Sequence, residues 1–110
     1  MINTEKLKDE IVQRLKPLNL ERVILFGSYA NGSPKEDSDI DLYVVTKDEF
    51  IPKNFREKRD LARAVSSAIR DLRGRVPIDL IVHTKGMYKK FSKLNSSFAD
   101  EVLKQGRVLL

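Results

Sequence analysis

The hydrophobic positions of this chain follow two kinds of pattern, which alternate along the sequence. Spacings of three and four residues predict amphipathic helices, whereas short apolar runs rich in β-branched residues predict strands. The predicted helices cover residues 4–16, 54–73, 87–94 and 97–105. The predicted strands cover residues 22–27, 39–46 and 76–82, with a short edge strand at 108–110. Helices that alternate with strands in this way are typical of α/β folds.

The apolar stripe of each predicted helix needs a sheet face to cover. We therefore predict an α/β fold with a small mixed β-sheet, helices packed on one face, and an acidic groove on the other. A chain of 110 residues is long enough for one modest hydrophobic core and too short for two. Residues 1–110 are therefore expected to form a single domain.

The composition narrows the classes of partner and of site. The formal net charge of +5 attracts polyanions such as nucleoside triphosphates or RNA, without choosing between them. The chain has no cysteine, which excludes disulfides and thiolate metal sites. No apolar run reaches membrane-spanning length and the N-terminus lacks the apolar segment of a signal peptide, so we expect a cytoplasmic location and no membrane partner.

Two acids open the second predicted strand. Asp39 and Asp41 stand two residues apart, so both carboxylates project from the same face, roughly 6.5 to 7 Å apart along the backbone. Like charges at this separation raise each other's proton affinity unless a cation lies between them. Oxygen ligands of this kind suit a hard ion such as Mg²⁺, which also binds substrate phosphates.

The turn after the first predicted strand suits an anion rather than a cation. Gly27 and Ser28 follow an apolar run at 23–26, and small residues let the backbone approach a ligand closely. Backbone N–H groups at such a turn form a positive cradle for phosphate. A phosphate cradle beside metal-binding carboxylates predicts nucleotide chemistry.

A third acid lies within the strand predicted at 76–82. Asp79 is the single acid of this apolar strand, and a buried carboxylate there needs a partner, a cation or water. It is either a member of the site or an edge-strand acid that faces water. His83, the only histidine, has no second histidine or cysteine near it in the sequence, so we leave it out of the site.

These residues resemble a known family. The pattern is Gly27-Ser28, a gap of ten residues, and then Asp39-Ile40-Asp41-Leu42. It is similar to that of the nucleotidyltransferase superfamily related to DNA polymerase beta, above all to its small, free-standing members, the minimal nucleotidyltransferases. The tail from Phe98 onward is similar to theirs as well. One departure is Asn31 before Gly32, where close relatives often have an arginine.

The resemblance implies a Mg²⁺-dependent transfer of a nucleoside monophosphate, with two Mg²⁺ ions and with ATP as the donor. In the family's pattern Asp39 and Asp41 are metal ligands. Asp79 matches the family's third carboxylate, which holds metal near the acceptor hydroxyl and helps to take its proton. Gly27 and Ser28 match the turn that holds the β- and γ-phosphates.

The resemblance also implies a partner. Small free-standing members are commonly encoded beside a small helical protein of the HEPN class, as an antitoxin beside its toxin. In that setting the transferase adds AMP from ATP to a tyrosine of the HEPN-type partner.

Two other functions stay open at this stage. One is a non-catalytic antitoxin that neutralises its partner by binding alone, although three mutually repelling acids argue against a site without a function. The other is a nucleotidyltransferase that acts on RNA or on a small hydroxylated molecule. The basic faces permit RNA, but a chain of this length has little room for a module that recognises it, so nucleic acid is not favoured.

Overall fold

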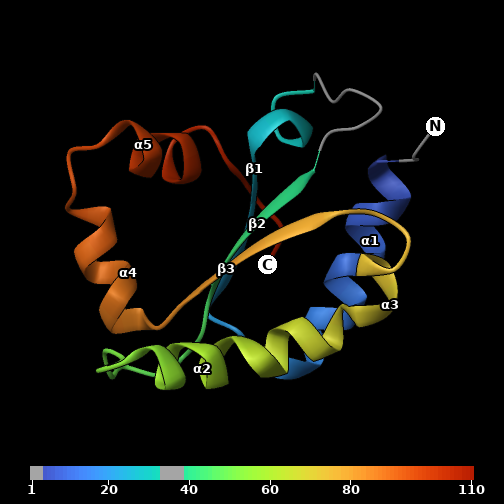
Figure 1. The fold of residues 1–110 in the computed structure, drawn as a ribbon. Coiled ribbons are helices and arrows are strands. Elements are labelled where there is room, and N and C mark those ends of the chain that lie inside the picture. The colour runs from blue at the N-terminus through green and yellow to red at the C-terminus, as the bar shows by residue number, and fades with distance from the viewer. Residues whose placement is uncertain (1–3, 33–38) are drawn as a thin grey trace.

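A four-stranded mixed β-sheet lies at the centre of the computed structural model, which describes residues 4–32 and 39–110 (Figure 1). The strands, in the order in which they lie side by side, are β3 (Ile78–His83), β2 (Ile40–Val45), β1 (Arg22–Phe26) and β4 (Arg107–Val108). The helices are α1 (Thr4–Leu15), α2 (Phe55–Ala68), α3 (Arg70–Arg73), α4 (Lys85–Ser92) and α5 (Ser97–Leu103). Two short 3₁₀ turns, η1 (Lys16–Leu18) and η2 (Gly27–Tyr29), follow α1 and β1.

The sheet is mixed because its two kinds of connection differ. β1 runs antiparallel to both β2 and β4, whereas β2 and β3 are parallel. A parallel pair needs a long crossover, and here α2 and α3 supply it. The register places Asp41 opposite Asp79 on one side and opposite Phe26 on the other.

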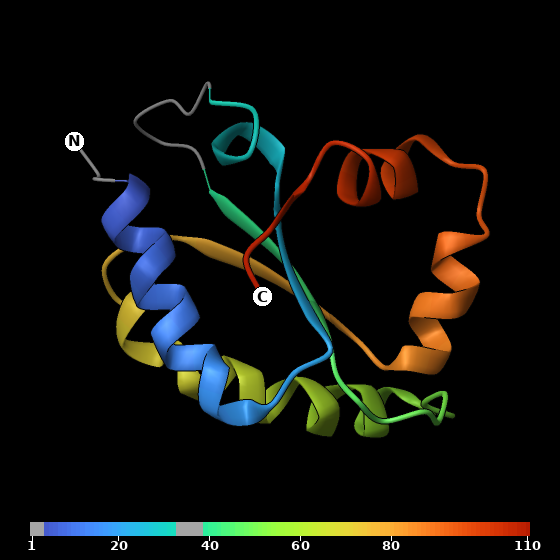
Figure 2. The same ribbon diagram turned by 180° about the vertical axis from the view of Figure 1, so that it is seen from behind.

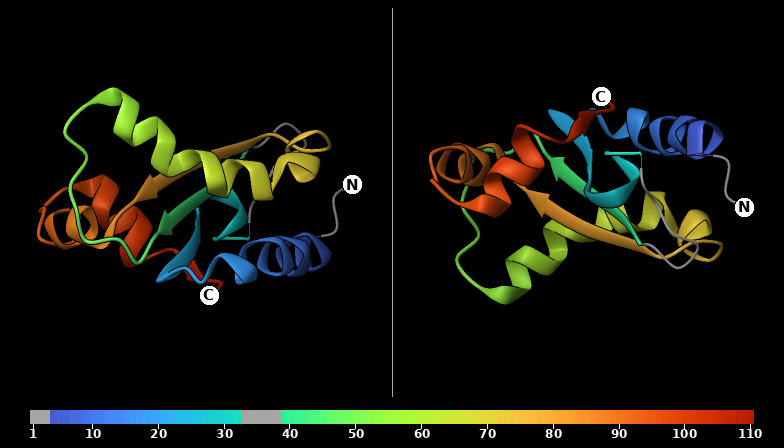
Figure 3. Two further views of the ribbon diagram at one scale, coloured as in Figure 1. Left: turned by 90° about the horizontal axis from the view of Figure 1, so that it is seen from below. Right: turned by 90° about the horizontal axis from the view of Figure 1, so that it is seen from above.

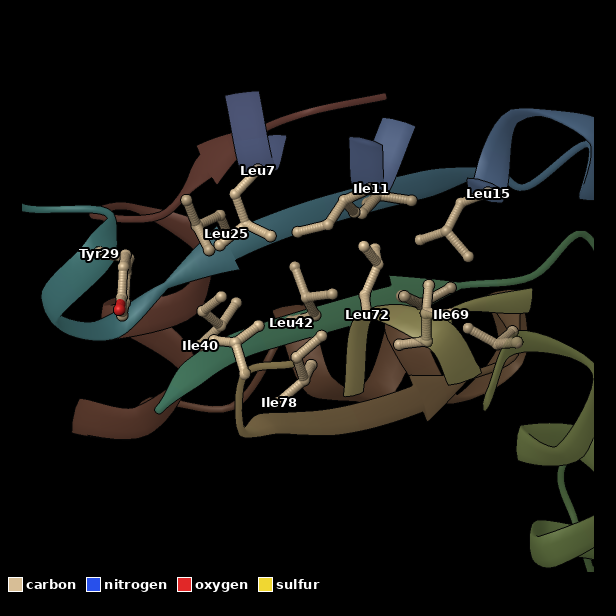
Figure 4. Packing of buried hydrophobic residues seen from close by; sticks show 14 of the residues in the cluster. Leu7, Ile11, Leu15, Leu25, Tyr29, Ile40, Leu42, Ile69, Leu72 and Ile78 are labelled. Atoms are coloured by element: carbon tan, nitrogen blue, oxygen red, sulfur yellow. The ribbon is translucent and has the colours of Figure 1, made fainter. Parts of the chain in front are cut away.

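Three helices cover one face of the sheet. Seen from behind, α1 and α3 lie on the opposite side of the strands from α4 and α5 (Figure 2). Figure 3 shows α1 along the β1 side of the sheet and α2 along the β3 side. Alternate strand residues meet the helix stripes in one apolar core (Figure 4). Its buried leucine and isoleucine residues are Leu7, Ile11, Leu15, Leu25, Ile40, Leu42, Ile69, Leu72 and Ile78.

The predicted α/β class, with a small mixed sheet and a helical layer, is confirmed. The structure adds helices on the other face, where α4 and α5 cover a second and more aromatic cluster. That cluster contains Ile24, Phe26, Tyr43, Val45, Phe91, Ala99 and Val102. Asp41 lies two residues before Tyr43 and four before Val45 in β2, so its side chain is on this face, at one end of the cluster.

The long helix predicted at 54–73 is two helices in the structure. Asn54 begins α2 as predicted, because its side chain accepts a hydrogen bond from the Glu57 N–H at 2.9 Å. The helical geometry then breaks at the fully buried Ile69, two residues after Ser67. Among residues 4–32 and 39–110, no helix is both long enough and apolar enough to cross a membrane.

Candidate active site

The parallel register of β2 and β3 brings two of the predicted acids together. Asp41 and Asp79 are each the second residue of their strand and face each other across the ladder. Asp79 is exposed on the edge strand, whereas Asp41 is half-buried. Burial is the main cause that raises the pKa of Asp41, followed by the negative charges of Asp79, Asp39 and Glu101. Asp79 therefore lies at a sheet edge and beside Asp41 at the same time.

Asp39 lies less close to the pair. It comes directly before β2 and is exposed, and its charge contributes to the raised pKa of Asp41. Within the described parts of the chain, no three carboxylate or imidazole groups are gathered closely enough to hold a metal. The structure thus brings Asp41 and Asp79 into contact and leaves Asp39 within electrostatic range.

The turn η2 touches the acid pair. Gly27 has φ of +78°, in the left-handed region that favours glycine, and accepts hydrogen bonds from the N–H groups of Ala30 and Asn31 at 3.1 and 3.3 Å. A Cβ added to Gly27 would overlap the carboxylate oxygen Oδ2 of Asp41. Only glycine suits this position, because a side chain would strain the backbone and displace the acid.

A small cavity of about 130 Å³ opens beside η2. It is lined by Gly27, Ser28, Asn31, Glu101 and Gln105. The sequence analysis did not select Glu101 and Gln105, which lie in the last turn of α5 and in the turn that follows it, more than 70 residues along the chain from η2. Their spacing of four residues places them on one side of the helix predicted at 97–105, but only the fold shows that both meet η2.

Arg107 fixes the turn from the other side. Its Nε–H donates a hydrogen bond of 2.7 Å to the carbonyl oxygen of Ala30, which follows η2 directly. Arg107 belongs to β4, whose two residues pair with Leu25 and Ile24 of β1. The C-terminal strand therefore holds the proposed phosphate turn in place.

The donor set fits a hard divalent cation. Asp41 and Asp79 offer carboxylate oxygens, and neither forms an ion pair with a basic side chain in residues 4–32 and 39–110. Two contacting carboxylates without a counter-charge favour a bound cation, and oxygen-only ligands favour Mg²⁺. The remaining ligands of such an ion include waters and substrate phosphates.

His83 has a partner in the core. Its Nδ1 lies 2.6 Å from the hydroxyl of Tyr43, and Phe91 stacks on the Tyr43 ring with 5.0 Å between ring centroids. Burial lowers the pKa of His83, and the positive charge of Lys58 lowers it further. Tyr43 and His83 lie on the same face of the sheet as the acids, and both rings pack against Phe91.

Comparisons with known proteins identify relatives of this chain. The family described as "Polymerase beta, Nucleotidyltransferase" matches residues 5–110. Two proteins of Methanocaldococcus jannaschii are each 35% identical to this chain. "Putative protein adenylyltransferase MJ0604" aligns over 98% of this chain and 99% of its own length, and "Putative protein adenylyltransferase MJ0141" over 93% and 90%.

Solved structures share the fold. A putative nucleotidyltransferase from Sulfolobus solfataricus has a TM-score of 0.60 at 22% identity, over 96% of this chain and 80% of its own. A crystal structure described as "the toxin-antitoxin with AMP-PNP" has a TM-score of 0.57 at 24% identity, over 94% of this chain and 72% of its own. At these identities the likeness establishes the architecture.

Proposed function

Because the chain belongs to the polymerase beta nucleotidyltransferase family, and is therefore a nucleotidyltransferase, we propose that it transfers AMP from ATP to a hydroxyl group of a partner protein. The proposed cofactor is Mg²⁺, and the proposed acceptor is a tyrosine of a HEPN-type toxin, for which this chain is the antitoxin. Transfer of AMP and a protein acceptor follow the names of the two archaeal relatives, and ATP as the donor follows the family resemblance. The toxin follows the description of the structural neighbour, and the tyrosine and the HEPN class follow the family resemblance.

One observation carries the proposal: the Asp41 carboxylate contacts both Asp79 and the Gly27 turn. The carboxylate pair favours a cation, whereas the turn favours an anion. Here the Asp41 side chain lies between the two and contacts both. A nucleoside triphosphate with a divalent cation is the substrate class that satisfies both at once.

The residues divide the reaction between them. Backbone N–H groups of η2 at Gly27 and Ser28 bind the β- and γ-phosphates and orient the α-phosphate toward the acids. The acceptor oxygen forms a bond to the α-phosphorus as the bond to the pyrophosphate oxygen breaks, and the exposed Asp79 takes the hydroxyl proton. Asp39 and Asp41, together with Asp79 beside the acceptor hydroxyl, would hold Mg²⁺, and the ion would neutralise charge on the phosphates. Positioning and charge stabilisation provide most of the acceleration in this chemistry.

A direct test is incubation with ATP, Mg²⁺ and a purified HEPN-type toxin, followed by intact mass measurement. We expect the toxin to gain the mass of one AMP, and Tyr→Phe at the modified position to abolish the gain. The Asp79→Asn variant should bind the toxin and leave its mass unchanged. A toxin that is neutralised equally well by wild type and Asp79→Asn, with no change in mass, would support the non-catalytic antitoxin instead.

A further inference from the structure

A second hollow lies at the opposite end of the sheet from the acids. It has a volume of about 660 Å³ and is enclosed by η1, the segment after β2 and the first half of α2. Its apolar lining consists of Leu18, Leu20, Phe50, Leu61, Ala64 and Val65. β2 begins beside the acids and ends at this hollow, so about 20 Å of strand separates them. Hence this groove is separate from the proposed transfer site.

The rim of the groove is acidic, although the net charge of the whole chain is positive. Asp48, Glu57 and Asp60 line it, whereas Lys47 is the one basic residue that does so in the described parts of the chain. The ammonium group of Lys47 donates to the side chain of Asn19 at 2.9 Å, and Asp60 lies 3.9 Å from Arg63. With three acids and one base in its lining, the rim favours a cationic ligand over a nucleotide or RNA.

Large apolar side chains are exposed beside this rim. Phe50 lines the groove and is 50% exposed, and the neighbouring Ile51 and Phe55 are 44% and 76% exposed. Clustered exposed apolar side chains with a polar rim mark sites of protein interaction. A ligand that fits must therefore be apolar on one side as well as cationic.

The loop that carries Phe50 is held in position. The buried Thr84 donates a hydrogen bond of 2.6 Å to the Phe50 carbonyl oxygen, and the Lys85 N–H donates one of 2.8 Å to that of Asp48. A Cβ at Gly86 would overlap the Glu49 carbonyl oxygen, so the loop packs tightly on the start of α4. The exposed ring is thus presented by a preorganised surface, which lowers the entropic cost of binding.

We propose that this groove docks a basic amphipathic helix of a partner protein. Apolar side chains at positions i, i+3 or i+4, and i+7 of that helix fill the groove and cover Phe50. Flanking lysine or arginine side chains pair with Asp48, Glu57 and Asp60, which supplies the charge complementarity. A partner held here leaves the acid pair and η2 free to receive ATP, and the proposal does not depend on which acceptor the enzyme modifies.

The test uses two synthetic helical peptides with the same leucine pattern, one flanked by lysine and one by glutamate. Binding to the full chain is measured by fluorescence anisotropy, and the contact surface is mapped by NMR chemical shifts. We expect the lysine peptide to bind more tightly than the glutamate peptide and to shift resonances around Phe50 and Asp60. Equal binding of both peptides, or shifts centred on Asp41 and Gly27, would overturn the proposal.

Two variants, each with a matched control, test which residues contribute to binding of the lysine peptide. Asp60→Lys should weaken the lysine peptide by about tenfold at low salt, whereas Asp9→Lys, an equally exposed charge reversal on α1, should not change it. Phe50→Ser should weaken it by a similar factor, whereas Leu94→Ser, at a residue 55% exposed elsewhere, should not. Melting temperatures of the four variants verify that each is folded.

The same variants separate the partner helix from a second copy of this chain. Sedimentation of the wild type at increasing concentration should show a constant mass. A concentration-dependent dimer that Phe50→Ser abolishes would mean that the groove binds another copy, and would overturn the proposed occupant.

Discussion

The two faces of the sheet carry different kinds of side chain, and the alternating residues of β2 show this difference. Ile40, Leu42 and Val44 point to the face covered by α1, α2 and α3, where the side chains of β1, β2 and β3 are all apolar. Asp41 and Tyr43 point to the other face, which holds an acid pair at one end and a hydrogen-bonded tyrosine and histidine farther along. The apolar face stabilises the fold. The other face holds polar groups whose burial in the apolar core would cost free energy.

The largest expected effect breaks the stabilising face. Leu42 is fully buried, and Leu42→Ala should lower the free energy of unfolding by about 2–5 kcal/mol, because a cavity forms between β2 and the helices. Urea unfolding followed by circular dichroism measures the change. A loss below about 1 kcal/mol would show that the helices collapse onto the site and that this face is less tightly packed than the structure indicates.

The adjacent residue should show the opposite behaviour. Asp41→Asn removes a charge that Asp79, Asp39 and Glu101 all repel, so the free energy of unfolding should stay the same or rise. The rate of AMP transfer should fall on the order of 10²- to 10³-fold, as when a charge-stabilising group is removed from an active site. Unfolding and transfer assays on one preparation measure both. A large loss of stability would contradict the division between the faces.

A smaller effect is expected at the strand that supports η2. Arg107→Ala removes the hydrogen bond to the Ala30 carbonyl, so the KM for ATP should rise about 2- to 10-fold while kcat changes little. Arg56→Ala, at an exposed residue of α2, is the control for the loss of one positive charge. An equal rise in KM for both variants would indicate general electrostatics in place of a fixed turn.

The smallest expected effect concerns His83, which is half-buried on the same face as the acids. Its pKa is lowered in the folded state, so the unfolded chain binds more protons as the pH falls below about 6.5. Stability should therefore decrease as the pH drops from 7 toward the folded pKa. In His83→Gln this part of the decrease should be absent, which a comparison of melting temperatures across that range checks.

Much of the fold could be predicted from the periods of hydrophobic residues. The predicted order of helices and strands is confirmed, and so is the resemblance of Gly27-Ser28 and Asp39-Ile40-Asp41 to small nucleotidyltransferases. The break at Ile69 was missed because neither glycine nor proline marks it, and only the Ser66-Ser67 pair precedes it.

The second helical layer was harder to place. Tyr43 and Val45 make the acidic face of β2 apolar over most of its length, which is the signal that helices must cover it. Which helices do so depends on long-range packing, since α4 and α5 each have an apolar stripe that fits either face. For the same reason Glu101 and Gln105 could not be assigned to the site from their positions in the sequence.

The contact between Asp41 and Asp79 depends on a backbone ladder, since six consecutive residue pairs align β2 with β3. The length of the segment that joins these strands therefore does not set the spacing of the two acids. A change in the length of that segment would leave the two acids paired as long as the ladder between β2 and β3 persists. A shift of β3 by a single residue, in contrast, would place Leu80 or Ile78 opposite Asp41 and remove the carboxylate pair.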